Sequence, residues 1–400
     1  MRRTLQQQTT PERMIFFMTG ILFLLIYICL LLYYRYSWTT IPVFKPEPTT
    51  QPHVFITVII PARNEELNLP VLLHGLQDQT YPSRFFEIIV VDDHSTDRTH
   101  QVVTELAITN LKMVRLADFV NTGINSYKKK AIEIAISQSK GELIVTTDAD
   151  CIVRPAWLQN IASFYEEHKP ELIVMPVSVD CSNNILEIFQ ALDFMTLQGI
   201  TGASVHKKFH NMCNGANLSY TKSAFDAAGG FKGIDNLASG DDMMLMHKIS
   251  KLYPEKLMYL RSKDVIVNTA PEKTLALFIN QRIRWTSKSG NFGDKRILAV
   301  LLFVYAFNSI LFILPFIAVF SNDGVPVFNY HLSLITFWLF LVFSKTIIEL
   351  FFLYPVAKFF NKQGLLFIFP LLQPFHIIYT VIVGVLGKFG TFKWKGRKVK

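Results

Sequence analysis

Hydrophobic and polar positions divide the chain into three regions. Residues 15–34 form an apolar stretch without a charge, which is long enough to cross a bilayer as a helix. In residues 54–275 short apolar runs alternate with amphipathic segments, and three more long apolar blocks follow at 297–320, 332–360 and 365–386. The pattern predicts an N-terminal membrane anchor over residues 1–35, a globular domain over 54–275 and a C-terminal transmembrane region over 297–388.

Within the globular domain the period of the pattern switches repeatedly between that of a strand and that of a helix. Apolar runs predict strands at 55–60, 86–91, 113–116 and 143–147, and helical spacing predicts helices at 65–77, 95–106 and 129–139. Such alternation implies parallel strand pairing with right-handed crossovers. The predicted fold class is therefore α/β with a mostly parallel sheet, joined to the anchor by a linker over residues 36–53 that contains four prolines.

The first apolar stretch has two interpretations. A cleaved signal peptide would have a shorter apolar part followed by small residues. Here Tyr33, Tyr34, Tyr36 and Trp38 follow instead, and such aromatic residues are typical of a membrane interface. We therefore predict an uncleaved anchor.

The apolar blocks also contain features that bear on topology. Lys345 and Glu349 lie four residues apart, so they share a helix face either as a mutually satisfied pair or as a contact for a lipid head group or a sugar; the former is preferred. Pro370 and Pro374 interrupt the last block, which therefore either crosses the membrane or is re-entrant or interfacial. A crossing would put the basic tail, residues 389–400, on the side opposite the globular domain, against the positive-inside rule.

Composition and charge support a membrane protein. Half of the 400 residues are hydrophobic, 34 are Phe and the net charge is +9. Because the basic residues flank the apolar blocks, anionic lipid is a better partner for them than nucleic acid, which we exclude. The four cysteines lack CxxC spacing, so they predict reduced thiols rather than zinc ligands or a disulfide framework.

Two acidic motifs follow predicted strands, where α/β proteins bind ligands. Asp92 and Asp93 follow the second strand and precede Ser95, which can cap the next helix, so the motif either supplies ligand-binding carboxylates or serves only helix capping. Asp148 and Asp150 follow the strand at 143–147. Two carboxylates at this spacing suit a hard cation such as Mg²⁺ or Mn²⁺, the alternative being a solvated turn.

Three further motifs carry polar chemistry, and each has a plain structural alternative. Residues 128–130 are three lysines that either form a solvated helix face or meet a diphosphate. The Asp241–Asp242 pair opens a predicted helix, where carboxylates suit the helix dipole or act as a general base. The QxxRW motif precedes the second apolar block, which predicts an interfacial helix over residues 276–296. Its side chains are Gln281, Arg284 and Trp285.

Neither GxGxxG nor GxxxxGK[ST] occurs, which argues against a dinucleotide-binding Rossmann domain and against a P-loop enzyme. In order and spacing the acidic motifs and QxxRW resemble those of the family 2 glycosyltransferases, which include cellulose, chitin, hyaluronan and poly-N-acetylglucosamine synthases. The resemblance covers roughly residues 54–290 and implies a GT-A nucleotide-sugar-binding domain. The chain has Asp241 where the family commonly has Glu, and fewer apolar blocks than synthases that export their polymer.

The resemblance also implies roles for individual residues. Asp148 and Asp150 would bind a divalent cation, Mg²⁺ or Mn²⁺, and Asp242, with Asp241 beside it, would be the catalytic base. Further residues would contact the nucleotide sugar: Asp92, Asp93, Lys128, Lys129, Asp148, Gln281, Arg284 and Trp285.

The function expected from the sequence is that of a membrane-bound inverting glycosyltransferase. It would move a sugar from a UDP-sugar to a lipid-linked or polysaccharide acceptor, for cell-envelope polysaccharide or glycolipid synthesis. We expect a multi-pass protein of the cell membrane with its catalytic domain in the cytosol, and partner proteins for export remain open. The alternative is a non-catalytic membrane scaffold or transporter subunit with a degenerate transferase domain, against which the intact acidic motifs argue.

Overall fold

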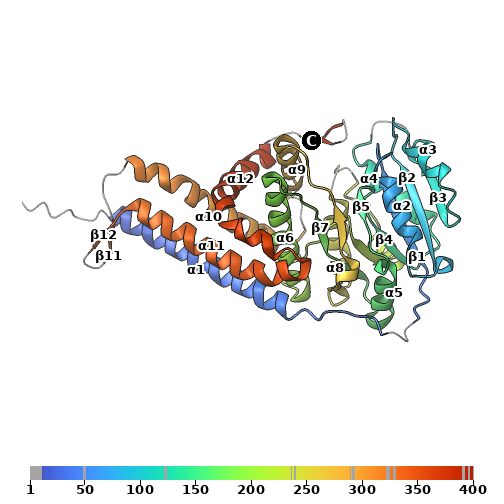
Figure 1. Ribbon diagram of the computed structural model, residues 1–400, viewed down its shortest axis with the longest axis horizontal. Helices are drawn as coiled ribbons and strands as arrows, with labels where there is room; N and C mark the ends of the chain where they lie inside the picture. The colour runs from blue at the N-terminus through green and yellow to red at the C-terminus, as the bar shows by residue number, and fades with distance from the viewer. Residues whose placement is uncertain are drawn as a thin grey trace, which may run out of the picture.

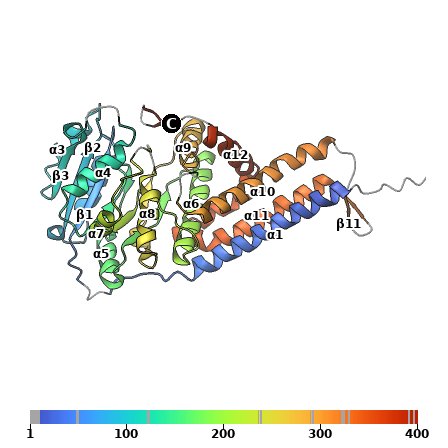
Figure 2. The same ribbon diagram turned by 180° about the vertical axis from the view of Figure 1, so that it is seen from behind.

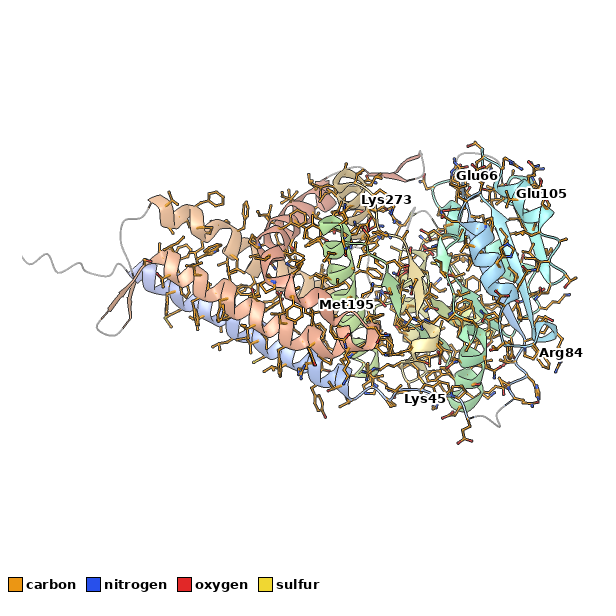
Figure 3. The ribbon with its side chains drawn as sticks, viewed as in Figure 1. Lys45, Glu66, Arg84, Glu105, Met195 and Lys273 are labelled. Carbon is orange, nitrogen blue, oxygen red and sulfur yellow. The ribbon has the colours of Figure 1, made fainter. Side chains whose placement is uncertain are left out.

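The computed structural model describes residues 11–47, 51–120, 124–235, 237, 240–288, 290, 293–320, 325–327, 330–389, 392–394 and 397–399. These residues form an α/β domain and a bundle of long helices that extends away from it (Figures 1 and 2). Figure 3 shows charged side chains such as Glu66, Arg84 and Glu105 on the α/β domain, whereas Met195 lies between the domain and the bundle.

A seven-stranded sheet forms the centre of the α/β domain, with the strand order β3-β2-β1-β4-β8-β6-β9. β1, β2, β3 and β4 pair in parallel, while β8 is antiparallel to β4 and β6, and β6 and β9 are parallel. The predicted mostly parallel sheet is thus confirmed. The strands are β1 (Ile56–Ala62), β2 (Phe86–Asp92), β3 (Leu111–Arg115), β4 (Leu143–Thr146), β6 (Leu172–Val174), β8 (Leu218–Thr221) and β9 (Leu257–Tyr259).

Helices cover both faces of this sheet, and a second, three-stranded sheet lies beside it. The small sheet contains β5 (Cys151–Ile152), β10 (Val267–Thr269) and β7 (Val177–Val179). The helices of the domain are α2 (Leu69–Gln77), α3 (Thr99–Glu105), α4 (Tyr127–Ser137), α5 (Trp157–His168), α6 (Ile185–His206), α7 (Lys222–Ala227), α8 (Asp241–Leu252) and α9 (Leu275–Thr286).

The central strands are continuous apolar runs because both of their faces are buried. Along β1, Ile59 packs in one hydrophobic cluster, whereas Val58 and Ile60 pack in the cluster on the opposite face. Alternate residues of a strand point to opposite faces, so a strand covered on both sides is apolar at nearly every position. This is why the sequence pattern located these strands closely.

Two predicted helices begin later than expected. The helix predicted at 65–77 starts at Leu69, and the one predicted at 95–106 starts at Thr99. The expectation that Ser95 caps the second helix is wrong: its amide donates to Asp92 Oδ1, 3.0 Å away, and its Oγ accepts from the amide of Asn64. The polar residues that suggested helix starts instead build the turns after β1 and β2.

Four helices of the described chain are long and apolar enough to cross a membrane. They are α1 (Pro11–Thr39), α10 (Lys295–Phe320), α11 (Leu334–Phe360) and α12 (Phe369–Phe389). Each corresponds to a predicted apolar block within a few residues, although α1 continues four residues into the predicted linker that begins at residue 36. In the basic tail, the described residues form strands β13 (Phe392–Trp394) and β14 (Arg397–Val399), which pair with each other.

The helix α12 is arranged differently from the other three. In both ribbon views α1, α10 and α11 run together to the end of the bundle that is far from the α/β domain, near β11 (Val325–Val327), whereas α12 does not reach that end (Figures 1 and 2). The helix begins just after the end of α11 that adjoins the α/β domain. Its last turn approaches α9, where a Cβ on Gly387 would lie 2.6 Å from Thr286 Cγ2. Both ends of α12 therefore lie toward the α/β domain.

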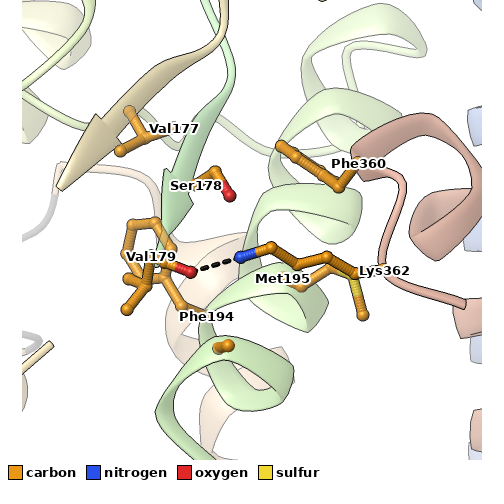
Figure 4. A pocket seen from close by; sticks show the side chains of 8 residues that line it. Val177, Ser178, Val179, Phe194, Met195, Phe360 and Lys362 are labelled. Atoms are coloured by element: carbon orange, nitrogen blue, oxygen red, sulfur yellow. Dashed lines mark hydrogen bonds between the residues drawn. The ribbon is translucent and has the colours of Figure 1, made fainter. Parts of the chain in front are cut away.

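The bundle packs against the α/β domain through α6. A Cβ on Gly202 would lie 2.8 Å from the Trp38 ring of α1, so only glycine permits this close helix approach. At the end of α11, the Lys362 ammonium donates a hydrogen bond to the carbonyl of Val179 in β7, beside Phe360 and Met195 (Figure 4). The long apolar helices are thus in contact with the domain that carries the acidic motifs.

The preferred interpretation of Lys345 and Glu349 is confirmed. Lys345 Nζ lies 2.7 Å from Glu349 Oε1, and both side chains are buried inside the bundle. A buried charge is costly unless it is paired and hydrogen-bonded, and these two charges compensate each other.

Candidate functional site

The carboxyl ends of β1, β2 and β4 lie at one edge of the sheet, because the strands are parallel neighbours. Asp92 and Asp93 are at the end of β2, where both side chains are buried. The amide of Asp93 donates to the carbonyl of Ala62 over 2.8 Å, and its Oδ1 lies 3.0 Å from His94 Nδ1. Arg63 donates to the carbonyls of Asp93 and His94 over 2.8 and 3.0 Å, which fixes the turn after the strand.

Lys128, in the first turn of α4, connects two of the predicted acidic motifs. Its Nζ donates to Asp148 Oδ1 over 2.6 Å and lies 3.5 Å from Asp241 Oδ2. Burial by itself lowers the pKa of Lys128, but Asp148 and Asp241, with Asp242, raise it further than burial lowers it. The ammonium is therefore held in its charged form between carboxylates that are far apart in the sequence.

Asp242 is oriented by two backbone amides at the start of α8. Its Oδ2 accepts from the amide of Gly215 over 2.8 Å, and its Oδ1 accepts from the amide of Met243 over 2.8 Å. Gly240 precedes the helix with φ 81°, a conformation that favours glycine. Burial and the neighbouring Asp241 raise the pKa of the Asp242 carboxyl above its usual value. The carboxylate is thus both fixed in position and made more basic.

The turn of small residues at 214–217 therefore belongs to the site. A Cβ on Gly215 would lie 3.5 Å from Lys128 Nζ and 3.5 Å from Asp241 Oδ2, so the backbone of this turn adjoins the charged cluster. In contrast, Gly229 and Gly230 form a turn whose second carbonyl accepts from Lys248 over 2.6 Å.

The QxxRW motif lies on α9 and turns different residues toward different partners. Gln281 Nε2 donates to Glu272 Oε1 over 3.0 Å, and Gln281 Oε1 accepts from Arg282 over 2.9 Å. Arg282 also lies over the ring of Trp285, 4.1 Å from its centroid. The Trp285 indole could stack on a sugar, but the Arg282 guanidinium covers one of its faces.

Arg284 faces the acidic cluster instead. Burial lowers the pKa of its guanidinium, while the nearby carboxylates of Asp148, Asp241 and Asp242 act in the opposite direction. The structure therefore gathers side chains from α4, α8 and α9, together with Asp148 from the turn after β4, around one acidic centre.

The turn after β4 offers two carboxylates for a cation. Asp150 is exposed and Asp148 is partly exposed, with one oxygen bonded to Lys128. Within the described residues no group of three or more His, Cys, Asp and Glu side chains could hold a metal ion. Two carboxylates nevertheless fit Mg²⁺ or Mn²⁺, which commonly take their remaining oxygen ligands from a bound diphosphate and from water.

The structure separates the three lysines at 128–130. Lys129 is buried, and its Nζ donates to the carbonyls of Ile234 and Leu237 over 2.7 and 2.6 Å. Lys130 pairs with Glu133 over 2.8 Å on the helix surface. Of the three, Lys128 is thus the lysine in direct contact with the acidic centre.

Sequence reasoning missed Lys288, which follows α9. Burial lowers the pKa of Lys288 to about 8, although Asp242 opposes that shift. Its Cδ would lie 3.2 Å from a Cβ on Gly240, which places the side chain beside the start of α8. In the sequence, Lys288 stood out only as one of the basic residues that precede the apolar block at 297–320.

Comparison with known proteins gives the family context of this site. The model described as "Glycosyl transferase family 2" matches residues 57–228, and the model "Glycosyl transferase family group 2" matches residues 143–381, more than half of the chain. A poly(ribitol-phosphate) beta-N-acetylglucosaminyltransferase of Staphylococcus aureus is 33% identical over 120 residues, which are 30% of this chain and 20% of that protein.

A beta-monoglucosyldiacylglycerol synthase of Nostoc is 29% identical over 117 residues, covering 29% of this chain and 24% of that protein. The match thus spans only about a fifth to a quarter of the length of these relatives. A solved mannosyltransferase from Pyrobaculum calidifontis, in complex with GDP-Man and Mn²⁺, is similar in fold, with a TM-score of 0.53 and 19% identity over 93% of this chain and 98% of that chain. Because the two family models together cover the α/β domain, the acidic centre and most of the C-terminal apolar helices, the chain belongs to the family 2 glycosyltransferases.

Proposed function

We propose that this protein is an inverting glycosyltransferase that moves a sugar from a UDP-sugar to a lipid-linked or polysaccharide acceptor at a membrane. The observation that carries the proposal is the contact of one ammonium, that of Lys128, with both Asp148 and Asp241. This contact connects Asp148, from the motif that suits a cation and a diphosphate, with Asp241, from the motif that suits a general base. The intact set of charged groups argues against a non-catalytic scaffold.

In this proposal Asp242 takes the proton of the acceptor hydroxyl as that oxygen attacks the anomeric carbon. The bond from the anomeric carbon to the diphosphate oxygen breaks on the opposite face, so the configuration inverts. The amides of Gly215 and Met243 orient the carboxylate, and its raised pKa makes it a better base. Lys128 and Arg284 would offset the negative charge that gathers on the leaving diphosphate.

Asp148 and Asp150 would hold a divalent cation, Mg²⁺ or Mn²⁺. When bound, such a cation supplies charge stabilisation to the diphosphate. Asp92 and Asp93, at the same edge of the sheet, would contact the uracil and ribose. Gln281 and Trp285 would lie beside the donor and the acceptor, and Arg282 covers one face of the Trp285 indole. Lys129, bonded to two backbone carbonyls, would support this site by holding the segment that precedes α8.

The names of the relatives support the reaction class and two acceptor classes, a polymer and a lipid. The test is release of the nucleotide diphosphate by the purified protein in lipid, across a panel of UDP-sugars with GDP-mannose included, and mass spectrometry of the lipid and glycan products. UDP release from one UDP-sugar with a glycosylated product would support the proposal. Turnover of GDP-mannose alone would contradict the donor class, and no turnover of any sugar would contradict the activity.

Replacing Lys128 with methionine is expected to raise the KM for the donor by about 10- to 100-fold, because a charge-assisted hydrogen bond is lost and Asp148 and Asp241 are left facing each other. Lys130→Met is the matched control on the same helix, since Lys130 makes only a surface ion pair. Steady-state kinetics against donor concentration measures both. Equal KM values in the two variants would contradict the placement of Lys128 at the donor.

We further propose that α1, α10 and α11 cross the membrane while α12 lies at its cytosolic side. The support is the position of both ends of α12 toward the α/β domain. This arrangement puts the basic tail on the same side as the α/β domain, which agrees with the positive-inside rule and removes the conflict that a fourth crossing creates.

A reporter fused after Lys400 is therefore expected on the cytosolic side, together with Lys288. A reporter inserted between α10 and α11 is expected on the opposite side. Protease protection in sealed vesicles compares the three positions. Protection that groups the C-terminus with the α10–α11 connection would show that α12 crosses the membrane.

A further inference from the structure

A cavity outside the acidic centre lies between α6, α11 and α12, within the bundle. Glu349 and Gln373 form one polar wall. Lys345 Nζ donates to Glu349 Oε1 over 2.7 Å and to Gln373 Oε1 over 2.8 Å, and Tyr27 donates its hydroxyl to Glu349 Oε1. Gln373 Nε2 donates to Glu349 Oε2 over 2.5 Å. The ammonium is thus compensated, and Glu349 Oε2, which has a single donor among the described residues, keeps room to accept another hydrogen bond.

Asp193 and His376 contribute a second polar wall. Asp193 Oδ2 accepts two bonds from Arg282, over 3.1 Å from Nε and 2.8 Å from Nη2. Its Oδ1 has no donor among the residues that the structure describes. Nδ1 of His376 is buried and has no hydrogen-bond partner there either. A buried polar atom such as His376 Nδ1 is costly to leave unpaired, and the partly exposed Asp193 carboxylate can accept a further hydrogen bond, so this wall has unused capacity for a polar ligand.

The charges of the cavity identify the kind of polar group that fits. Its two carboxylates are each paired with one cation, Glu349 with Lys345 and Asp193 with Arg282. A phosphate would therefore meet two carboxylates without a surplus cation to compensate it. The unused sites are mainly acceptors, to which Thr196 adds its hydroxyl oxygen while donating to the carbonyl of Leu192. Neutral hydroxyl groups, which donate hydrogen bonds, fit this set.

The remaining walls are apolar. Phe189, Leu192, Phe369 and Leu372 complete the lining. Beside them on the outer surface, Phe367 is 91% exposed and Leu371 is 79% exposed. Large apolar side chains that are so exposed on a membrane-associated helix suit contact with acyl chains. A polar interior next to an apolar surface matches an amphiphile with a hydroxyl head.

We propose that this cavity binds the hydroxyl-bearing head group of a neutral lipid. Asp193 would accept a hydrogen bond from the lipid hydroxyl, and the same carboxylate is paired with Arg282 of α9. Only this ion pair would therefore separate the lipid from α9. The proposal concerns binding alone, and it does not depend on whether sugar is transferred to that lipid.

The test uses the purified full-length protein in nanodiscs with a photoactivatable diacylglycerol and no nucleotide sugar. We expect the label on the peptide that contains Gln373 and His376. Excess unlabelled diacylglycerol should reduce that labelling by roughly tenfold, whereas phosphatidic acid with the same acyl chains should leave it nearly unchanged, because the phosphate lacks a compensating cation. Equal competition by the two lipids, or label spread evenly over the bundle, would overturn the proposal.

A pair of variants tests the location. Leu372→Trp puts a large side chain into the cavity and should reduce labelling by roughly three- to tenfold, as expected when the head group loses a hydrogen bond. Ile382→Trp puts the same side chain at an exposed position of the same helix that does not line the cavity, and it should leave labelling unchanged. Equal labelling of the two variants would overturn the proposal. The competition experiment needs no variant, so it decides the matter even if Leu372→Trp fails to fold.

Discussion

Replacing Asp242 with asparagine is expected to slow sugar transfer by about 10²–10⁴-fold while the donor binds nearly as in the wild type, because general-base catalysis typically contributes that factor. Asparagine keeps the shape of the side chain, and its amide oxygen can still accept from the amide of Gly215. What is lost is the ability to take the proton of the acceptor hydroxyl. Transfer is followed by product formation, and donor binding by calorimetry.

Asp241→Asn is the matched control on the adjacent residue. It removes one charge that faces Lys128 but leaves the proposed base in place, so a much smaller loss is expected. If Asp241→Asn abolishes transfer and Asp242→Asn does not, the base is assigned one residue too far along the chain. If neither change matters, the two carboxylates only stabilise the start of α8.

The same assignment predicts a pH dependence. A base must be ionised to act, so the rate of transfer should fall as the pH drops through the pKa of Asp242. Because burial and Asp241 raise that pKa, the fall should occur above the ordinary value of 3.8. Lys288→Met removes a cation that lowers this pKa, so the acidic limb should move to higher pH. The exposed Lys295→Met should not move it.

Replacing Asp150 with alanine is expected to reduce donor turnover by about 100-fold or more and to weaken donor binding, since loss of cation binding forfeits several kcal/mol of charge stabilisation at the diphosphate. Asp150 is the sharper test of the pair, because Asp148 also bonds Lys128 and its loss would disturb the site without any cation. Asp118→Ala, at an exposed carboxylate near the end of β3, should leave turnover unchanged.

A chelator titration of the wild type belongs with this variant. Activity should disappear in excess chelator and return with Mg²⁺ or Mn²⁺. Full activity in excess chelator, or an Asp150→Ala variant as active as Asp118→Ala, would show that the reaction does not use a cation at this turn.

The sequence alone determined the elements that depend on local pattern. Strands such as β1 and β4 were located because burial on both faces makes nearly every position apolar. The long apolar helices were located because their length and composition suit a bilayer. Helix starts were located less well, since the polar residues at 65–68 and 95–98 suit turns as well as caps.

The sequence also indicated which residues gather at the site, because the carboxyl ends of neighbouring parallel strands meet at one edge. It did not determine how they share their contacts. Lys128 and Lys129 are equivalent in a charge run, yet one faces Asp148 while the other is bonded to two backbone carbonyls. The difference arises because successive residues of a helix point about 100° apart, and only packing sets which of them faces the acidic centre.

The orientation of α12 was likewise decided by tertiary structure. Its composition suits a membrane crossing, yet its last turn approaches α9 and its Gln373 joins Lys345 and Glu349. Hydrophobicity is a property of each segment and can be summed along the chain. The direction of a helix and the partner of a buried charge depend on contacts between segments that are far apart in sequence, which no local pattern records.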